Sequence, residues 1–377
     1  MKEVILTALF CCLMLRFSLA QKDFFHGQAS ILSSFSPKNE LPLFLGARYI
    51  PELRLNTSID SVKNIDFVAS ANISGTVLFS DFNTGESAFN LNPYRIWLRY
   101  SSPQFELRVG LQKIDFGSAA ILRPLQWFNQ IDPRDPLQLT NGAYGIMGRY
   151  TFLNNTNIRL WGLYGNERPR GFDVVPNNKS VPEFGGRIQN PVPKGELAFS
   201  YHHRTANSTG INQVDPFSKI PENRFGLDGK WDLGVGLWFE AVYVHKEKQI
   251  DNLTNQTLLN LGIDYTFAVG TGLNTVFEHM LINFDREGIA LDNSTPVSAA
   301  TINYPLSFFD NLMSVIYYDW SGKNASFFVN YSHQFNKITG YVMAYYNPES
   351  IQQGIQQNDL VNQFEGPGLR LMLVYNH

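Results

Sequence analysis

Short segments in which apolar and polar residues alternate recur along this chain, each about ten residues long. The clearest covers residues 105–112, where Phe105, Leu107, Val109 and Leu111 alternate with polar residues or glycine. Such a segment suits a strand with lipid or a core on one side and water on the other. Repeated behind an export signal, the alternation predicts an all-β fold closed into one antiparallel transmembrane barrel.

The first twenty residues are predicted to be a cleaved signal peptide. Lys2 precedes an apolar stretch, Val4–Leu15, and Ser18–Ala20 supplies small residues before Gln21. A membrane anchor is the alternative, but the apolar stretch is shorter than the ~20 residues that span a bilayer. We therefore expect residues 21–377 to form a single barrel domain.

The composition of the exported part is consistent with a barrel. Both cysteines, Cys11 and Cys12, lie in the signal, so disulfides cannot stabilise the fold and a closed hydrogen-bond ladder must. Aromatic residues make up 14% of the chain, a share that two aromatic girdles would use. A net charge of -3 gives no sign of a nucleic-acid partner. A soluble β-sandwich is the alternative, although sandwiches of this length usually divide into two domains.

Connection lengths provide a strand count, because an antiparallel barrel alternates short periplasmic turns with longer outer loops. Tight links are predicted at 101–103, 154–156, 190–193, 232–234, 270–272, 309–310 and 336–337, and long connections at 81–92, 114–142, 167–182, 205–221, 285–296 and 348–365. The strands between them are predicted near 27–36, 46–58, 64–80, 93–101, 104–113, 143–153, 157–166, 183–190, 194–204, 222–232, 235–247, 255–268, 271–284, 297–306, 310–320, 324–334, 337–347 and 366–377. The count is 18, with 16 as the alternative, and both termini are expected on the periplasmic side.

The last predicted strand looks like the carboxy-terminal signal that outer-membrane barrels present to the barrel-assembly machinery. Leu369, Leu371, Leu373 and Tyr375 share one face of it. The chain ends in His377, whereas the usual pattern ends in an aromatic residue.

The polar faces of the strands are predicted to line the lumen, because an arginine or lysine at the lipid midplane would cost about 2–4 kcal/mol. The predicted pore-lining residues are Arg95, Trp97, Arg99, Glu106, Arg108, Arg149, Arg159, Arg187, Arg204, Arg224, Asp228, Glu240, Asp264 and Glu278, with Glu52, Asp66 and Glu196 interspersed. This order predicts a wall that is basic on one side and acidic on the other, a field that could select solutes by charge. Pairing between neighbouring strands, which would only stiffen the wall, is the alternative for each arginine.

The connection 113–141 is the most distinctive segment. It contains three prolines and a set of charged residues that we take as a candidate constriction: Lys113, Asp115, Arg123, Asp132, Arg134 and Asp135. Prolines and paired charges indicate an ordered loop. It could fold into the lumen, or it could pack outside on its neighbours.

Two blocks of this chain resemble the alginate-export-type barrels and related Bacteroidetes porins. The first runs through Phe105–Pro136, with Asp115-Phe116-Gly117 and Asp132-Pro133-Arg134-Asp135, and the second through Gly185–Arg187 and Gly195–Arg204. The resemblance implies an outer-membrane porin-like channel. In the alginate exporter the lumen is strongly basic for a polyuronate, and the wall here is more mixed.

The predicted function is a channel for passive diffusion of small polar solutes, with anionic and saccharide solutes as candidates, in the outer membrane of a Gram-negative bacterium. An exporter of an acidic polysaccharide and a structural or adhesion barrel are the alternatives. No phosphate loop, hydrolase elbow or paired-histidine metal site occurs, and adjacent His202 and His203 face opposite ways on a strand. We predict no enzyme activity, metal or cofactor, and a monomer or a trimer.

Overall fold

A computed structural model describes residues 24–39, 42–80, 83–211, 215–348 and 365–377. The predicted signal peptide and most of the last outer connection therefore lie outside the described residues. Eighteen strands are described, and their bounds follow.

The strands are β1 Phe25–Phe35, β2 Leu43–Ser58, β3 Asn64–Ser80, β4 Asn83–Ser101, β5 Phe105–Gln112, β6 Ala143–Thr151, β7 Asn157–Leu163, β8 Glu183–Val192, β9 Gly195–Ala206, β10 Ile220–Asp232, β11 Gly236–Lys246, β12 Asn255–Phe267, β13 Leu273–Asp285, β14 Thr295–Pro305, β15 Asp310–Asp319, β16 Asn324–Gln334, β17 Ile338–Asn347 and β18 Gly366–Asn376.

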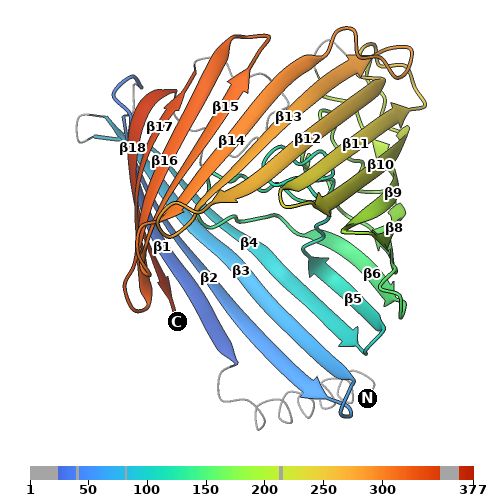
Figure 1. Cartoon of the computed structure of the whole chain (residues 1–377), viewed down its shortest axis with the longest axis horizontal. Helices are drawn as coiled ribbons and strands as arrows, with labels where there is room; N and C mark the ends of the chain where they lie inside the picture. The colour runs from blue at the N-terminus through green and yellow to red at the C-terminus, as the bar shows by residue number, and fades with distance from the viewer. Residues whose placement is uncertain (1–23, 40–41, 81–82, 212–214, 349–364) are drawn as a thin grey trace.

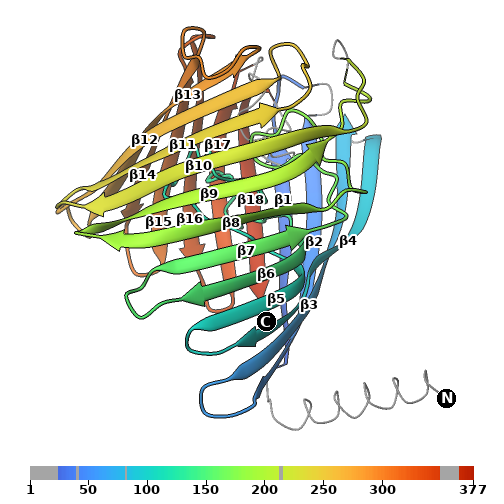
Figure 2. The same cartoon turned by 90° about the vertical axis from the view of Figure 1, so that its right-hand side faces the viewer.

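Each strand pairs antiparallel with the next in sequence, and β1 pairs with both β2 and β18. The ladder therefore closes into a barrel, in which no strand lacks a neighbour on either side (Figure 1). Short turns lie at one end, here called the turn end, and the longer connections lie at the other, the loop end (Figure 2). Among the described residues, no helix has both the length and the apolar character needed to cross a membrane.

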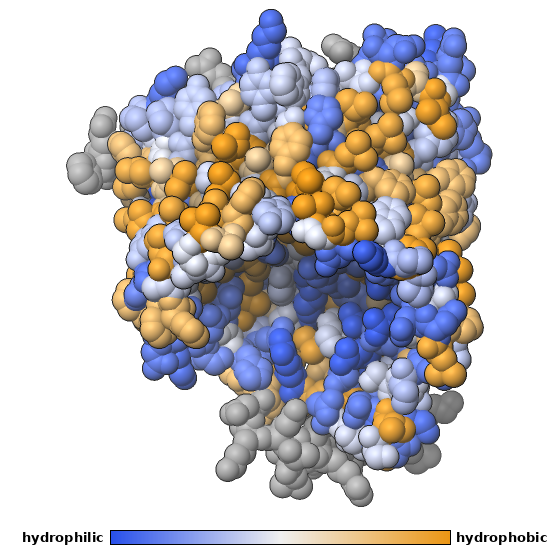
Figure 3. All heavy atoms as spheres, viewed as in Figure 1, coloured by the Kyte–Doolittle hydropathy of each residue, from blue (hydrophilic) through white to orange (hydrophobic). Residues whose placement is uncertain are grey.

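The outer face of the barrel is apolar because the alternation of each strand places its large hydrophobic side chains outward. In β18, Leu369, Leu371 and Leu373 are more than half exposed, whereas Met372 and Val374 between them are buried. The same pattern recurs around the barrel, and Figure 3 shows the resulting band of hydrophobic atoms above a hydrophilic hollow. An exposed apolar band around a closed ladder is typical of a barrel that lies in lipid.

The predicted antiparallel barrel and its count of 18 strands are confirmed. Two details are wrong. Residues 83–92, predicted as part of an outer connection, extend β4 because they pair with β3 from Asn72 to Ser80. The tight link predicted at 190–193 falls later, because β8 continues to Val192 and Lys194 takes the positive φ of the turn.

Gly110 in β5 provides a test of this register. Its φ is +123°, and a Cβ there would lie 2.1 Å from the carbonyl oxygen of Ile96 on β4. Gly110→Ala should therefore weaken the β4–β5 pairing by about 2 kcal/mol or more, through strain and the clash. Gly148→Ala is the control, because its Cβ would meet only the Phe105 ring at 4.0 Å. Unfolding in urea, followed by electrophoretic mobility, should separate the two; equal midpoints would contradict the register.

Candidate functional site

The segment between β5 and β6, residues 113–142 and here called the inserted loop, lies inside the barrel (Figure 1). Its apolar side chains are buried among lumen-facing side chains of β11 to β18, such as Val242, Met280 and Val297. The buried apolar residues of the loop are Ile114, Phe116, Ile121, Leu122, Leu125, Trp127 and Phe128. The loop therefore folds inward, and its apolar side chains form one hydrophobic core with those of the barrel wall.

Two wall carboxylates hold the backbone of the inserted loop. Glu240 on β11 accepts the N–H of Ala119 at 2.7 Å and of Leu125 at 3.0 Å. The Glu240 side chain is buried. Gly117 is needed beside its carboxylate, because a Cβ at position 117 would lie 2.4 Å from Glu240 Oε1.

Glu278 on β13 binds residues 120–122 of the loop, which lie between Ala119 and Leu125. It accepts N–H groups of the loop at 2.6 Å, 3.2 Å and 2.6 Å, from Ala120, Ile121 and Leu122, and the indole N–H of Trp238 at 3.0 Å. Glu240 and Glu278 were predicted to line the pore, but the structure buries both against the loop. Hydrogen bonds to a charged acceptor are worth about 1.5–3 kcal/mol each, so these five backbone contacts fix the position of the loop.

On the other side of the loop, an aromatic cluster packs it against β7 and β9. Phe116 and Phe128 lie against the ring of Trp161, with centroids 5.6 Å and 5.4 Å away. Trp161 donates its indole N–H to Nδ1 of the buried His202 at 3.2 Å. His203 points the opposite way and contacts Asn223, as the strand alternation predicted.

The charges predicted to form a constriction pair mostly with one another. Asp115 bonds Arg123 at 2.6 Å and lies 3.3 Å from Lys113, while Arg134 bonds Asp132 at 2.7 Å. Burial favours the neutral acid of Asp115, but the nearby Arg123, Asn129 and Lys113 outweigh it and lower the pKa of this carboxyl. These pairs stabilise the loop from within.

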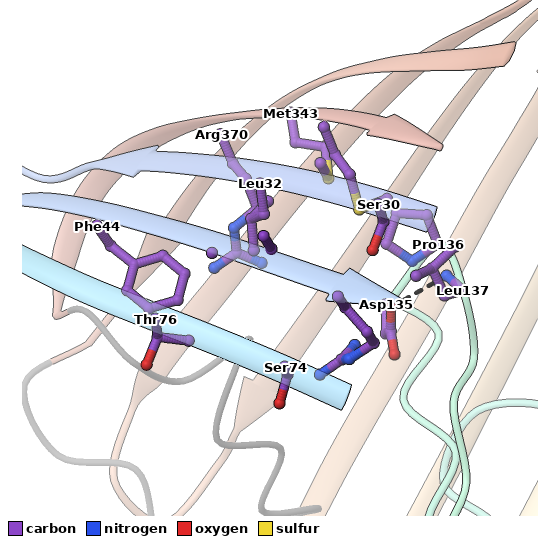
Figure 4. A pocket seen from close by; sticks show the side chains of 14 residues that line it. Ser30, Leu32, Phe44, Ser74, Thr76, Asp135, Pro136, Leu137, Met343 and Arg370 are labelled. Atoms are coloured by element: carbon purple, nitrogen blue, oxygen red, sulfur yellow. Dashed lines mark hydrogen bonds between the residues drawn. The ribbon is translucent and has the colours of Figure 1, made fainter. Parts of the chain in front are cut away.

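Asp135 lies where the loop meets β1, β2 and β18. Burial raises its pKa above the ordinary value, although the N–H groups of Leu137 and Leu139 donate to it at 3.0 Å and 3.2 Å. A narrow cavity of about 40 Å³ separates this part of the loop from the wall, and Figure 4 shows Arg370, Ser30 and Ser74 around it.

The predicted separation of a basic and an acidic side is wrong for three arginines. Arg187 bonds Asp228 at 2.6 Å, and both side chains are almost completely buried. Arg204 contacts Glu222 and Asp173, and Arg224 contacts the same two acids. Buried charges need such partners, because an unpaired one would carry the full desolvation cost.

Of the acids that pair with them, Asp228 was among the predicted residues, whereas Glu222 and Asp173 were missed from the sequence. Glu222 occupies the same face of β10 as Arg224 and Asp228, so the alternation could have identified it. Asp173 comes from the connection between β7 and β8, and no strand pattern marks it. Glu183 was also missed; it begins β8 and bonds Arg170 at 2.7 Å.

A second group of predicted residues remains open to the lumen, on β4 to β6. Arg99 bonds Asp66 at 2.7 Å, while Arg108 and Arg149 bond Glu106 at 2.9 Å and 3.2 Å. The guanidinium carbons of Arg108 and Arg99 lie 4.9 Å and 5.6 Å from the ring centroid of Trp97. This group, Trp97, Arg99, Glu106, Arg108 and Arg149, is here called the basic wall.

The remaining predicted residues lie around these groups. Arg95 donates to the backbone and side chain of Thr140, at the end of the inserted loop. Arg159 donates to the carbonyl of Asp115 at 3.4 Å. Asp264 lies at the turn end, in a hollow that Lys194 and Lys230 also line. In the described part of the chain, no three His, Cys, Asp or Glu side chains are grouped so as to hold a metal ion.

A closed 18-stranded antiparallel barrel with a polar lumen and an inserted loop has the architecture of a porin. Solved structures of outer-membrane porins share it. OccD3 (OpdP) of Pseudomonas aeruginosa has a TM-score of 0.56 and 9% identity, covering 93% of this chain and 90% of that one. OccAB1 of Acinetobacter baumannii has a TM-score of 0.56 and 9% identity, covering 94% and 95%. OccAB4 of the same organism has a TM-score of 0.52 and 11% identity, covering 94% and 97%.

At these identities the likeness concerns the fold. No protein-family model matches the chain, and no curated protein matches it in sequence. The resemblance to alginate-export-type barrels therefore stays a prediction.

The carboxylate anchors generate a prediction about the inserted loop. Glu240→Gln combined with Glu278→Gln should release residues 119–125, because an amide nitrogen cannot accept the N–H groups that each carboxylate receives. Amide hydrogen exchange in this segment should rise by about 10–100-fold, the equivalent of one or two lost bonds to a charged acceptor.

Asp264→Asn is the matched control, since among the described contacts its carboxylate makes none with the loop. It should leave exchange at residues 119–125 unchanged. Unaltered exchange in the double variant would contradict the role of the two anchors.

Proposed function

We propose that the protein is an outer-membrane channel of a Gram-negative bacterium that lets small polar solutes diffuse passively. Three features support this: an apolar outer band, a ladder closed without a free end, and a fold shared with outer-membrane porins. In lipid, every backbone polar group needs a partner inside the protein, and a closed barrel satisfies that requirement.

The basic wall supports a preference for anionic solutes. Its arginines are more accessible than the acids that pair with them: the side chains of Arg149 and Arg99 are 43% and 32% exposed, against 12% for Glu106 and 13% for Asp66. A solute passing this wall therefore meets guanidinium groups first. Ion pairs with exposed arginines are weak, so a carboxylate or phosphate can compete for these donors.

The inserted loop would act as the constriction of this channel. Its two carboxylate anchors and its internal ion pairs keep it in one place, which suits a passive pore whose width is set by packing. We propose that the residues of the basic wall, together with Arg159, form the solute path beside it, whereas Arg95 is buried against Thr140 of the loop.

Export of an acidic polysaccharide is the second candidate. The observation that favours it is Trp97, whose ring lies close to both Arg99 and Arg108 and could stack on a sugar while the guanidinium groups bind its carboxylate. A barrel without transport, serving structure or adhesion, would show no conductance. We further propose that the protein has no enzymatic activity, is assembled through its last strand, and is a monomer or a trimer.

Conductance in planar bilayers tests this function. The purified, refolded protein should form open pores, and Arg99→Gln with Arg108→Gln should reduce the permeability of chloride relative to potassium several-fold, about the effect of 1 kcal/mol at the wall. Reversal potentials in a salt gradient measure this ratio. Lys323→Gln, an exposed change at the loop end, is the control and should leave the ratio unaltered.

Absence of any conductance would overturn the channel, and an unchanged ratio would overturn the role of the basic wall. Liposome swelling with neutral sugars, uronates and amino acids would then rank the solutes. Faster swelling with uronate oligomers than with monomers would favour the polysaccharide exporter.

A further inference from the structure

One stretch of the barrel wall lacks a strand. β4 pairs with β5 only from Ile96 to Ser101, because β5 ends at Gln112 and the chain then turns inward as the inserted loop. On the loop-end side of Ile96, residues 83–95 of β4 pair with β3 on one edge. Within the described residues, no strand pairs with their other edge. In Figure 2, β4 continues well beyond the ends of β5 and β6. We call the space beside residues 83–95, between the end of β5 and the loop end, the vacant lane. Its foot is the end next to β5.

The edge of β4 along the vacant lane is open. Phe89 and Leu91 are 72% and 62% exposed, and residues 85–91 are exposed throughout. Among the described residues, no backbone hydrogen bond other than those with β3 is formed by residues 86–93. In an antiparallel strand every second residue points its N–H and C=O to the same side, so this edge carries a row of free donors and acceptors.

The usual protections of such an edge are absent from its middle, residues 86–92. Natural sheets guard a free edge with lysine, proline or a bulge. Here Pro93 and the β-bulge at Tyr94 lie at the end of the vacant lane next to β5, and a second bulge lies at Gly85 near its other end. Between the two bulges, residues 86–92 contain no lysine or proline, and Glu86 is their only charged residue. The edge is thus suited to pairing with an added strand, as in β-augmentation.

The foot of the vacant lane is a hollow that carries a charge. Asn92 and Pro93 line one side of it, and residues 165–168 with Tyr144 line the other. Glu167 is paired with Lys179 at 2.8 Å, whereas Arg168 is exposed and no ion pair is described for it. The hollow therefore has a net positive charge that complements an acidic group.

A second copy of this chain cannot fill the lane with its own β4. Two barrels in one membrane have the same orientation, so their β4 strands would cross at about twice the strand tilt, roughly 80°. Strands crossed at that angle form no ladder. An extended segment that belongs to another protein can align with β4 and avoids this crossing.

We propose that the vacant lane is a docking site for an extended segment of a partner protein exposed at the loop end, which pairs antiparallel with β4 and continues the line of β5. Every second side chain of this segment is apolar and lies on the same face of the barrel wall as Phe89 and Leu91. Its amino-terminal end carries an acidic residue that meets Arg168. This role is separate from conduction of solutes.

Disulfide capture of a synthetic strand tests the proposal in the refolded barrel, residues 21–377, which contain no cysteine. The probe is a peptide with the sequence of residues 71–79, the segment of β3 that pairs with the other edge of β4. It carries cysteine at the place of Ile73, the residue opposite Leu91 in that register, and a glutamate added at its amino end. Leu91→Cys should capture it about tenfold faster than Leu98→Cys. Leu98 is the matched control, an outward leucine of β4 that is 50% exposed but lies beside β5.

Two further measurements make the result specific. A probe N-methylated at alternate amides, which cannot pair as a strand, should lose the preference for Leu91→Cys. Arg168→Glu should slow capture of the probe with the amino-terminal glutamate but leave a probe with an amino-terminal lysine as fast or faster.

Equal capture at Leu91→Cys and Leu98→Cys would overturn the proposal, as would undiminished capture of the methylated probe. Rapid disulfide linkage between Leu91→Cys chains without probe would make the lane an interface between copies and would also overturn it. Conductance recorded on the same variants keeps the two proposals apart, because a pore that conducts without capture contradicts only the docking site.

Discussion

The hydrogen bonds from the inserted loop to Glu240 and Glu278 are the interaction on which the rest of the interior depends. Five backbone N–H groups within seven residues point to two carboxylates on β11 and β13. Without these acceptors, a loop backbone crossing the lumen would leave buried donors unpaired, at a cost of about 1–3 kcal/mol each. The anchors therefore allow apolar side chains such as Leu122 and Leu125 to pack against the far wall.

The same inward turn shapes the barrel wall. Because the chain leaves the wall after Gln112 and returns at Ala143, β5, β6 and β7 are short, while β3 and β4 form a long hairpin beside them. The inserted loop and the vacant lane are thus two consequences of one change in chain direction. One concerns solutes in the lumen, and the other concerns what can align with an open strand edge.

Charge in the lumen is organised by burial. Where loops cover the wall, Arg187, Arg204 and Arg224 are buried and each has a carboxylate partner. Where the wall faces the open hollow, the arginines extend further than their acids. Pairing that stiffens the wall, one of the two alternatives left by sequence reasoning, therefore applies to the buried arginines, whereas the arginines of the basic wall stay accessible from the lumen.

Local patterns in the sequence were enough to predict the strands, their number and their direction, because the period of two in side-chain orientation and the alternation of turn lengths are properties of neighbouring residues. Gln112 could be recognised as the end of a strand and 113–141 as an ordered loop. The place of that loop could not, since it depends on Glu240 and Glu278, more than a hundred positions further along the chain. The tertiary structure decided the ion-pair partners of Arg204 and the unpaired edge of β4 for the same reason. Only closure of the barrel brings such distant residues into contact, or leaves a strand edge without a neighbouring strand.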